Sequence, residues 1–144
     1  MANKTYLLEV VTPERVVVTE DVEFTSAPGI EGSLGILADH APMLTALTIG
    51  MLEYEAPGGK KEKLTVTGGF MEVSGDKVTI LANAAEKTVE IDITRAEAAR
   101  RRAQERIEIA PSSNEDLDLA RAELALKRAI LRLEAAKDKR FDAE

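Results

Sequence analysis

Two hydrophobic periods divide the chain. From about residue 5 to residue 82, short runs rich in Val, Ile, Thr and Tyr alternate with residues that favour turns. After about residue 88, apolar positions recur at the 3.6-residue spacing of helices. We therefore expect a β domain over residues 1–88, followed by a helical domain over residues 89–144.

The runs of the first part have the length of strands. They cover residues 6–11, 15–19, 22–26, 63–67, 70–73 and 77–81. Pro- and Gly-containing turn signals separate them, at residues 12–13, 27–29, 57–59, 68–69 and 74–76. Because no helix-length period lies between the strands, the pattern predicts an antiparallel β-sandwich or barrel and argues against a parallel α/β sheet.

The first helix of the second part has two competing start signals. Asp92 is a suitable N-cap, and residues 94–97 form a capping box half a turn later. Strong helix formers continue to Ile109, and the Ala-Pro pair at 110–111 is expected to end the helix.

A second capping box at residues 112–115 opens a longer helix that is expected to reach about Lys139. The short link predicts an antiparallel two-helix hairpin. This helix carries two apolar stripes on nearly opposite sides, which fits burial on two sides or a change of partner. The stripes are Leu117, Leu124 and Leu131, and Leu119, Leu126, Ile130 and Leu133.

Arginine is concentrated in the helical part, where nine of the ten arginines lie beyond residue 90 although the formal net charge is -7. At about 100° per residue, each helix carries three of them on one stripe with the same spacing. The stripes are Arg95, Arg102 and Arg106, and Arg121, Arg128 and Arg132. Planar, permanently charged guanidinium groups suit phosphate. The alternative is a solvated face paired with local acids such as Glu97 and Glu105.

Composition excludes several classes of protein. Cysteine is absent and His40 is the only histidine, so disulfides, His-pair metal sites and a Cys–His dyad are excluded. Residues 1–89 hold seven basic and thirteen acidic residues, and aromatic residues make up only 3%, which argues against nucleic acid as a partner. No apolar stretch predicts membrane insertion or a signal peptide. We expect a cytosolic protein without a metal site, and neither an enzyme nor a free-standing anion binder is favoured.

Four stretches resemble the epsilon subunit of the bacterial F-type proton-translocating ATP synthase. They are APGIEGSLGILADHAPMLTALTIGML at 27–52, TVTGGFMEVSGDKVTILANAAE at 65–86, IDITRA at 91–96 and RAELALKRAILRL at 121–133. Together they cover essentially the whole chain in the family's order. The resemblance implies a β-sandwich of about ten strands followed by a two-helix hairpin, in a non-catalytic rotor subunit of the central stalk.

The resemblance also implies partners. The β domain would join the gamma subunit and the membrane c-ring at the cytoplasmic face of the bacterial membrane, as a peripheral protein. Glu31 and Gly32, in the loop at 29–35, would face the ring, and His40 would be an interface or structural residue. The hairpin would either fold against the β domain or extend to the catalytic alpha and beta subunits and block ATP hydrolysis.

In some bacterial members of the family, ATP binds the folded hairpin as a regulatory ligand, without any required cofactor and with the need for Mg²⁺ open. The matching residues here are Glu86, Ile91, Asp92, Arg95, Ala96, Arg102, Arg128 and Arg132. The arginines would hold phosphate, the two carboxylates ribose or adenine, and the two apolar residues the base. The alternative is the same rotor subunit without ATP sensing, whose arginines contact acidic residues of the catalytic subunits.

Overall fold

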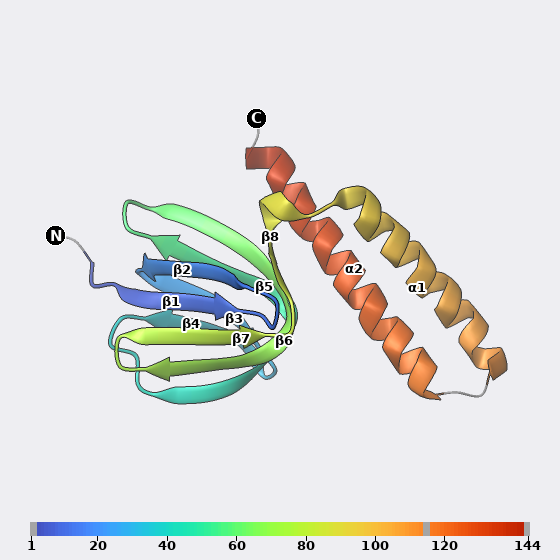
Figure 1. Ribbon diagram of the computed structural model, residues 1–144, viewed down its shortest axis with the longest axis horizontal. Helices are drawn as coiled ribbons and strands as arrows, with labels where there is room; N and C mark the ends of the chain where they lie inside the picture. Colours follow the sequence, from blue (N-terminus) through green and yellow to red (C-terminus); the bar gives the residue numbers. More distant parts are fainter. Residues whose placement is uncertain (1–2, 114–115, 143–144) are drawn as a thin grey trace. The chain divides into compact units, whose positions relative to one another are not determined.

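The computed structural model describes residues 3–113 and 116–142 (Figure 1). The chain divides into two compact units, Met1–Lys87 and Thr88–Glu144. The described part of the first unit is built from strands and that of the second from helices, so the expected combination of a β-sandwich and a helical hairpin is confirmed.

The first unit is one curled sheet whose strands surround a shared interior, as Figure 1 shows. Its strand order is β2-β1-β7-β6-β5-β3-β4, and β8 pairs with β6. All pairings are antiparallel except that of β1 with β7, which is parallel. The strands are β1 Tyr6–Val11, β2 Val16–Val22, β3 Phe24–Gly29, β4 Gly32–Leu37, β5 Met43–Ala56, β6 Lys60–Ser74, β7 Lys77–Ala82 and β8 Ala85–Lys87.

The described residues form eight strands, fewer than the ten or so that the resemblance implies. The runs predicted at 63–67 and 70–73 are a single strand, β6, which pairs with β8 through its first half and with β7 through its second. The predicted turn at 68–69 is therefore wrong. Gly69 has a φ of +131°, and a Cβ atom there would lie 2.0 Å from the backbone oxygen of Leu81. The absence of a side chain at Gly69 lets β7 approach β6 closely.

Other turn predictions had mixed outcomes. The signals at 57–59 and 74–76 mark the turns that follow β5 and β6. The signal at 27–29 is wrong, because these residues form the end of β3 and pair with β4. The pattern also missed β4 and β5. Most positions of β5 are half-buried on both faces, so the strand lacks the alternation by which a strand is predicted.

The sandwich core is aliphatic. Alternate residues of β1 point inward, and Tyr6, Leu8 and Val10 are at most 4% exposed. The Tyr6 hydroxyl lies 2.6 Å from Thr25 Oγ1 and 3.0 Å from the carbonyl oxygen of Ile36, so this buried hydroxyl is satisfied.

The second unit contains a short 3-10 helix, η1 (Thr88–Glu90), and two long helices, α1 (Ile93–Ser113) and α2 (Asp116–Asp142). Asp92 is the N-cap of α1, since its Oδ1 accepts the Arg95 backbone N–H at 3.1 Å. The competing capping box at 94–97 is not used, because Thr94 already lies inside the helix.

Two further helix predictions fell near the link. The expected stop at 110–111 is wrong, because α1 continues to Ser113. Pro111 therefore lies in the last turn of α1, and the helix ends two residues after it. The capping box at 112–115 includes residues outside the described part of the chain. No helix among the described residues is long and apolar enough to cross a membrane.

The two helices pack against each other. Among the described residues, the buried positions at seven-residue spacing are alanines, each at most 2% exposed. We call them the alanine seam: Ala96 and Ala103 of α1, and Ala122, Ala129 and Ala136 of α2. Residues 93–100 of α1 and 130–137 of α2 line one groove, so in this antiparallel pair we infer that Ala96 is level with Ala136 and Ala103 with Ala129.

Candidate anion-binding face of the hairpin

A groove of about 240 Å³ between the helices establishes which sides of α1 and α2 lie together. Its lining comes from both helices: Ile93, Glu97 and Arg100 of α1, and Ile130, Leu133, Glu134, Ala136 and Lys137 of α2. Apart from Ala136 of the seam itself, these residues are rotated from the seam by roughly 40° to 140° in one sense about each helix axis. They therefore mark one face of the hairpin.

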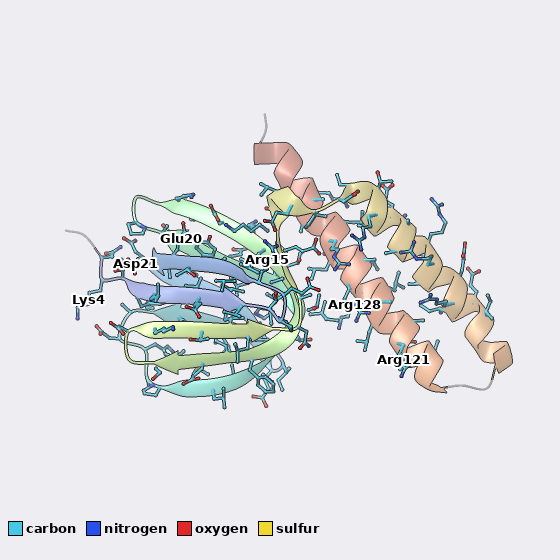
Figure 2. The ribbon with its side chains drawn as sticks, viewed as in Figure 1. Lys4, Arg15, Glu20, Asp21, Arg121 and Arg128 are labelled. Atoms are coloured by element: carbon cyan, nitrogen blue, oxygen red, sulfur yellow. The ribbon has the colours of Figure 1, made fainter. Side chains whose placement is uncertain are left out.

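The arginine stripes lie on the other face. On each helix the stripe is rotated from the alanine seam by about 90° in the sense opposite to the groove residues. In an antiparallel pair, equal rotations bring both stripes to the same face. We call this the arginine face: Arg95, Arg102, Arg106, Arg121, Arg128 and Arg132. Figure 2 shows Arg121 and Arg128 along one side of α2.

The arginines of the two helices interleave along the hairpin axis. With the alanines level as described, Arg102 of α1 lies between Arg128 and Arg132 of α2. At 1.5 Å of rise per residue, each axial offset is about 3 Å. Arg95 lies about 7 Å further toward the start of α1 than the level of Arg132. In this register, three of the four predicted arginines fall within about 6 Å along the hairpin axis, and the fourth, Arg95, lies beyond Arg132 toward the start of α1.

These guanidinium groups differ in exposure. Arg95 and Arg102 are exposed, whereas Arg128 and Arg132 are half-buried. Among the described residues, Arg95, Arg102 and Arg128 form no ion pair with a carboxylate. The alternative of local pairing fails for Glu97, which lines the groove on the opposite face. Like charges gathered on one face repel each other until an anion neutralises them.

The start of α1 holds the other motif residues. Ile91 and Ala96 are 4% and 2% exposed, so both are already packed, Ala96 within the alanine seam. Asp92 is exposed, and its cap occupies one carboxylate oxygen and leaves Oδ2 outside that bond. Asp92 can therefore cap the helix and still offer one acceptor.

Glu86 lies in β8 and so belongs to the first unit. It is half-buried, and its backbone oxygen accepts a hydrogen bond from Thr65 Oγ1 at 3.5 Å. The other seven predicted ATP-binding residues lie in the second unit. That Glu86 contributes to the ATP-binding site stays a prediction.

The predicted partner-contact residues do not form one cluster. Residues 29–35 are not a loop, since Gly29 pairs with Gly32 and the two strands join by a tight turn at Ile30–Glu31. Glu31 is exposed at this tip. His40 follows the opposite end of β4, about 20 Å away at 3.3 Å per residue. Its Nδ1 lies 2.7 Å from the carbonyl oxygen of Ala41, which favours a structural role.

Sequence reasoning missed the alanine seam. The signal was present as alanines at seven-residue steps on both helices, but alanine is frequent in helices for its propensity alone. Only burial distinguishes the seam from the remaining alanines, such as the half-buried Ala98.

Comparison with known proteins identifies the relatives of the chain. Residues 5–88 match the family model of the ATP synthase delta/epsilon chain β-sandwich domain, and residues 90–137 match that of its long α-helix domain. The ATP synthase epsilon chain of Pelotomaculum thermopropionicum is 59% identical over 107 residues, covering 74% of this chain and 79% of that one. The epsilon chain of Carboxydothermus hydrogenoformans is 58% identical over 100 residues, covering 69% and 74%.

A solved structure supports the same family assignment. A chain in the cryo-EM structure of the Euglena gracilis mitochondrial ATP synthase, comprising OSCP, F1 and c-ring, matches with a TM-score of 0.77 and 28% identity. The match covers 92% of this chain and 81% of that one. The resemblance found in the sequence is therefore confirmed, and the chain belongs to the ATP synthase delta/epsilon family, among its bacterial epsilon chains.

Proposed function

We propose that this protein is a non-catalytic rotor subunit of the central stalk of an F-type ATP synthase, and that its hairpin binds ATP when folded. Family membership supports the place in the assembly, as does the likeness to a chain in an F1 and c-ring assembly. On this proposal the sandwich joins the gamma subunit and the c-ring at the cytoplasmic face of the membrane. The extended hairpin reaches the catalytic alpha and beta subunits and restrains hydrolysis.

The observation that carries ATP binding is the convergence of arginines from both helices on the arginine face. Arg102, Arg128 and Arg132 lie within about 6 Å of each other along the hairpin axis. One phosphate chain can therefore contact both helices. Charge-assisted, bidentate hydrogen bonds to phosphate oxygens are stronger than those between neutral groups. A ligand held in this way would link α1 to α2.

The remaining residues would contact the nucleoside. The free oxygen of Asp92 and the carboxylate of Glu86 are acceptors, which suits ribose hydroxyls or the adenine amino group. Ile91 and Ala96 are already packed in the folded hairpin, so they would support the floor of the site and offer the base only a small apolar surface. ATP is on this view a regulatory ligand and not a cofactor.

Binding would stabilise the folded hairpin by mass action. A ligand that binds only this state stabilises it by about 2.7 kcal/mol at a concentration one hundred times its Kd. Such a contribution shifts a folded-to-extended equilibrium by about two orders of magnitude. The fraction of folded hairpin, and with it the restraint on hydrolysis, would then depend on the ATP concentration.

The test is calorimetric titration of ATP into the full chain, with ADP and GTP as controls. We expect saturable binding that prefers ATP. Arg102→Ala and Arg128→Ala should each weaken it by about tenfold to a hundredfold, the value of one lost charged hydrogen bond. Arg101→Ala is the matched control, because Arg101 is exposed on α1 and lies off the arginine face.

Two results would overturn ATP binding. Absence of binding up to millimolar ATP would leave a rotor subunit whose arginines contact acidic residues of the catalytic subunits. Equal weakening by Arg101→Ala would show that overall charge matters and the arginine face does not.

A further inference from the structure

The alanine seam lies directly beside the arginine face. Ala103 and Ala129 are 1% and 0% exposed. In the register inferred from the groove, they are level with each other across the hairpin. Each follows an arginine of the proposed phosphate contact, Arg102 and Arg128 respectively. The distance between the helix axes at this level therefore determines the distance between the two arginine stripes.

The size of the seam residues determines that axial distance. Packed helices lie about 8–10 Å apart, depending on the side chains at the contact. Alanine pairs favour the short end of this range, and leucine at the same positions would favour the long end. The stripes are thus held about 2 Å closer than an ordinary leucine contact would hold them.

Hairpin stability alone does not account for small residues here. A leucine in place of Ala103 or Ala129 would bury more apolar surface between the helices. Larger residues do occur at the interface on the groove side, where Ile93, Ile130 and Leu133 line the space between the helices. The small residues occupy the centre of the interface, next to the arginines.

We propose that Ala103 and Ala129 are positioning residues for a polyphosphate ligand. They hold the arginine stripes of α1 and α2 at a separation at which guanidinium groups of both helices contact the same phosphate chain. This inference rests on the proposed function, because it concerns the same arginine face. It adds that affinity depends on helix spacing as well as on the arginines themselves.

The experiment titrates inorganic tripolyphosphate and ATP into the full chain and into size variants. Ala103→Leu and Ala129→Leu should each raise both Kd values by about tenfold or more, since binding groups must be held within about 0.5 Å of their productive geometry. Leucine is nearly as good a helix former as alanine, so the circular dichroism at 222 nm should not fall.

Two variants control for packing and size. Ala103→Ser is close to alanine in volume, keeps the spacing and should retain the wild-type Kd. Ala98→Leu makes the same chemical change on α1, on the side facing away from α2, and should also bind like wild type.

Helix spacing is measured independently. The chain has no cysteine, so two introduced cysteines can be spin-labelled without background. Gln104 and Lys127 are exposed, lie off the arginine face and are nearly level across the hairpin. Leucine at position 103 or 129 should lengthen the distance between these labels by about 2 Å.

The outcomes separate this inference from the function on which it rests. If the wild-type chain binds neither tripolyphosphate nor ATP, both are overturned. If wild type binds and the leucine variants bind equally well at a wider spacing, only the positioning role is overturned. Loss of affinity at unchanged spacing would overturn it too, because the cause would then be something other than helix separation.

Discussion

Each of the two units is stabilised internally by a different kind of buried surface. The interior of the sandwich is filled with large residues such as Leu8, Leu52, Leu64 and Ile80, all at 0% exposure. In the described part of the helical unit, six of the seven buried apolar residues are alanines, and the seventh is Ile91. Apolar burial stabilises roughly in proportion to area, so the core of the sandwich contributes far more per residue.

This difference suits different tasks. A sheet whose strands pair across long sequence separations opens only as a whole, because its hydrogen bonds and its core are lost together. Helices satisfy their own backbone, so α1 and α2 can separate and remain helices. Because the alanine seam buries little apolar area, separating the helices would cost less free energy than separating a leucine interface. Repulsion within the arginine face would favour separation until an anion binds. On the proposed function, the second unit is the one that rearranges.

The two units can be followed separately in one sample. Both tyrosines, Tyr6 and Tyr54, are buried in the first unit. The α-helices of the described chain all lie in the second unit. Tyrosine fluorescence therefore reports on the sandwich and circular dichroism at 222 nm chiefly on the hairpin.

The largest effect is expected at a close approach inside the sandwich. Gly69→Ala would place a Cβ atom 2.0 Å from the backbone oxygen of Leu81, so β6 and β7 must move apart. We expect the free energy of unfolding of the first unit to fall by about 4 kcal/mol, measured by urea denaturation with tyrosine fluorescence. Gly75→Ala is the control, since its φ is also positive but no atom lies within 4 Å, and it should cost about 1 kcal/mol. Equal costs would contradict the role of close approach.

A smaller effect is expected at the start of the hairpin. Asp92→Ala removes the acceptor of the Arg95 backbone N–H and should lower the stability of the hairpin by about 1 kcal/mol, followed at 222 nm in urea. Asp92→Ser keeps a capping oxygen and should stay near wild type. A serine variant as unstable as the alanine variant would argue against capping. If the serine variant is stable but loses ATP binding, Asp92 also contacts the ligand.

The smallest effect is expected for a polar cluster in the sandwich. The Tyr54 hydroxyl donates a hydrogen bond to Glu62 Oε2 at 2.5 Å, and the Lys60 ammonium lies 2.9 Å from Oε1. The bond from Tyr54, aided by Lys60, lowers the pKa of the Glu62 carboxyl below its ordinary value. Because the folded-state pKa is the lower one, this stabilisation is present above the ordinary Glu pKa and is lost as pH falls through the lowered pKa.

Glu62→Gln should therefore destabilise the first unit by about 0.5 kcal/mol at pH 7, and the difference from wild type should shrink below about pH 4. Urea denaturation across this pH range, followed by tyrosine fluorescence, provides the measurement. Glu72→Gln, at an exposed position of the same strand, should have no effect at any pH. A difference between Glu62→Gln and wild type that does not depend on pH would exclude the ionised carboxylate as its source.

Much of the local structure followed from sequence because its causes are local. Local residues specify the β-prone runs of β1 and β7, the turns after β5 and β6, and the Asp92 cap. Other features depend on distant ones. Gly68 and Gly69 resemble a turn in sequence, yet Gly69 pairs with Leu47 of β5 and Ala82 of β7, and both glycines lie within β6. Likewise β5 is covered on both faces, which removes its alternation.

The candidate site divides in the same way. The sequence by itself determined that each helix carries a stripe of three arginines, because a fixed helical rotation follows from backbone geometry alone. Only the tertiary structure decided that both stripes share one face and that Arg102 lies between Arg128 and Arg132. That outcome depends on the antiparallel direction and the register of two helices. Burial of small side chains sets both, and no local pattern specifies which alanines will be buried.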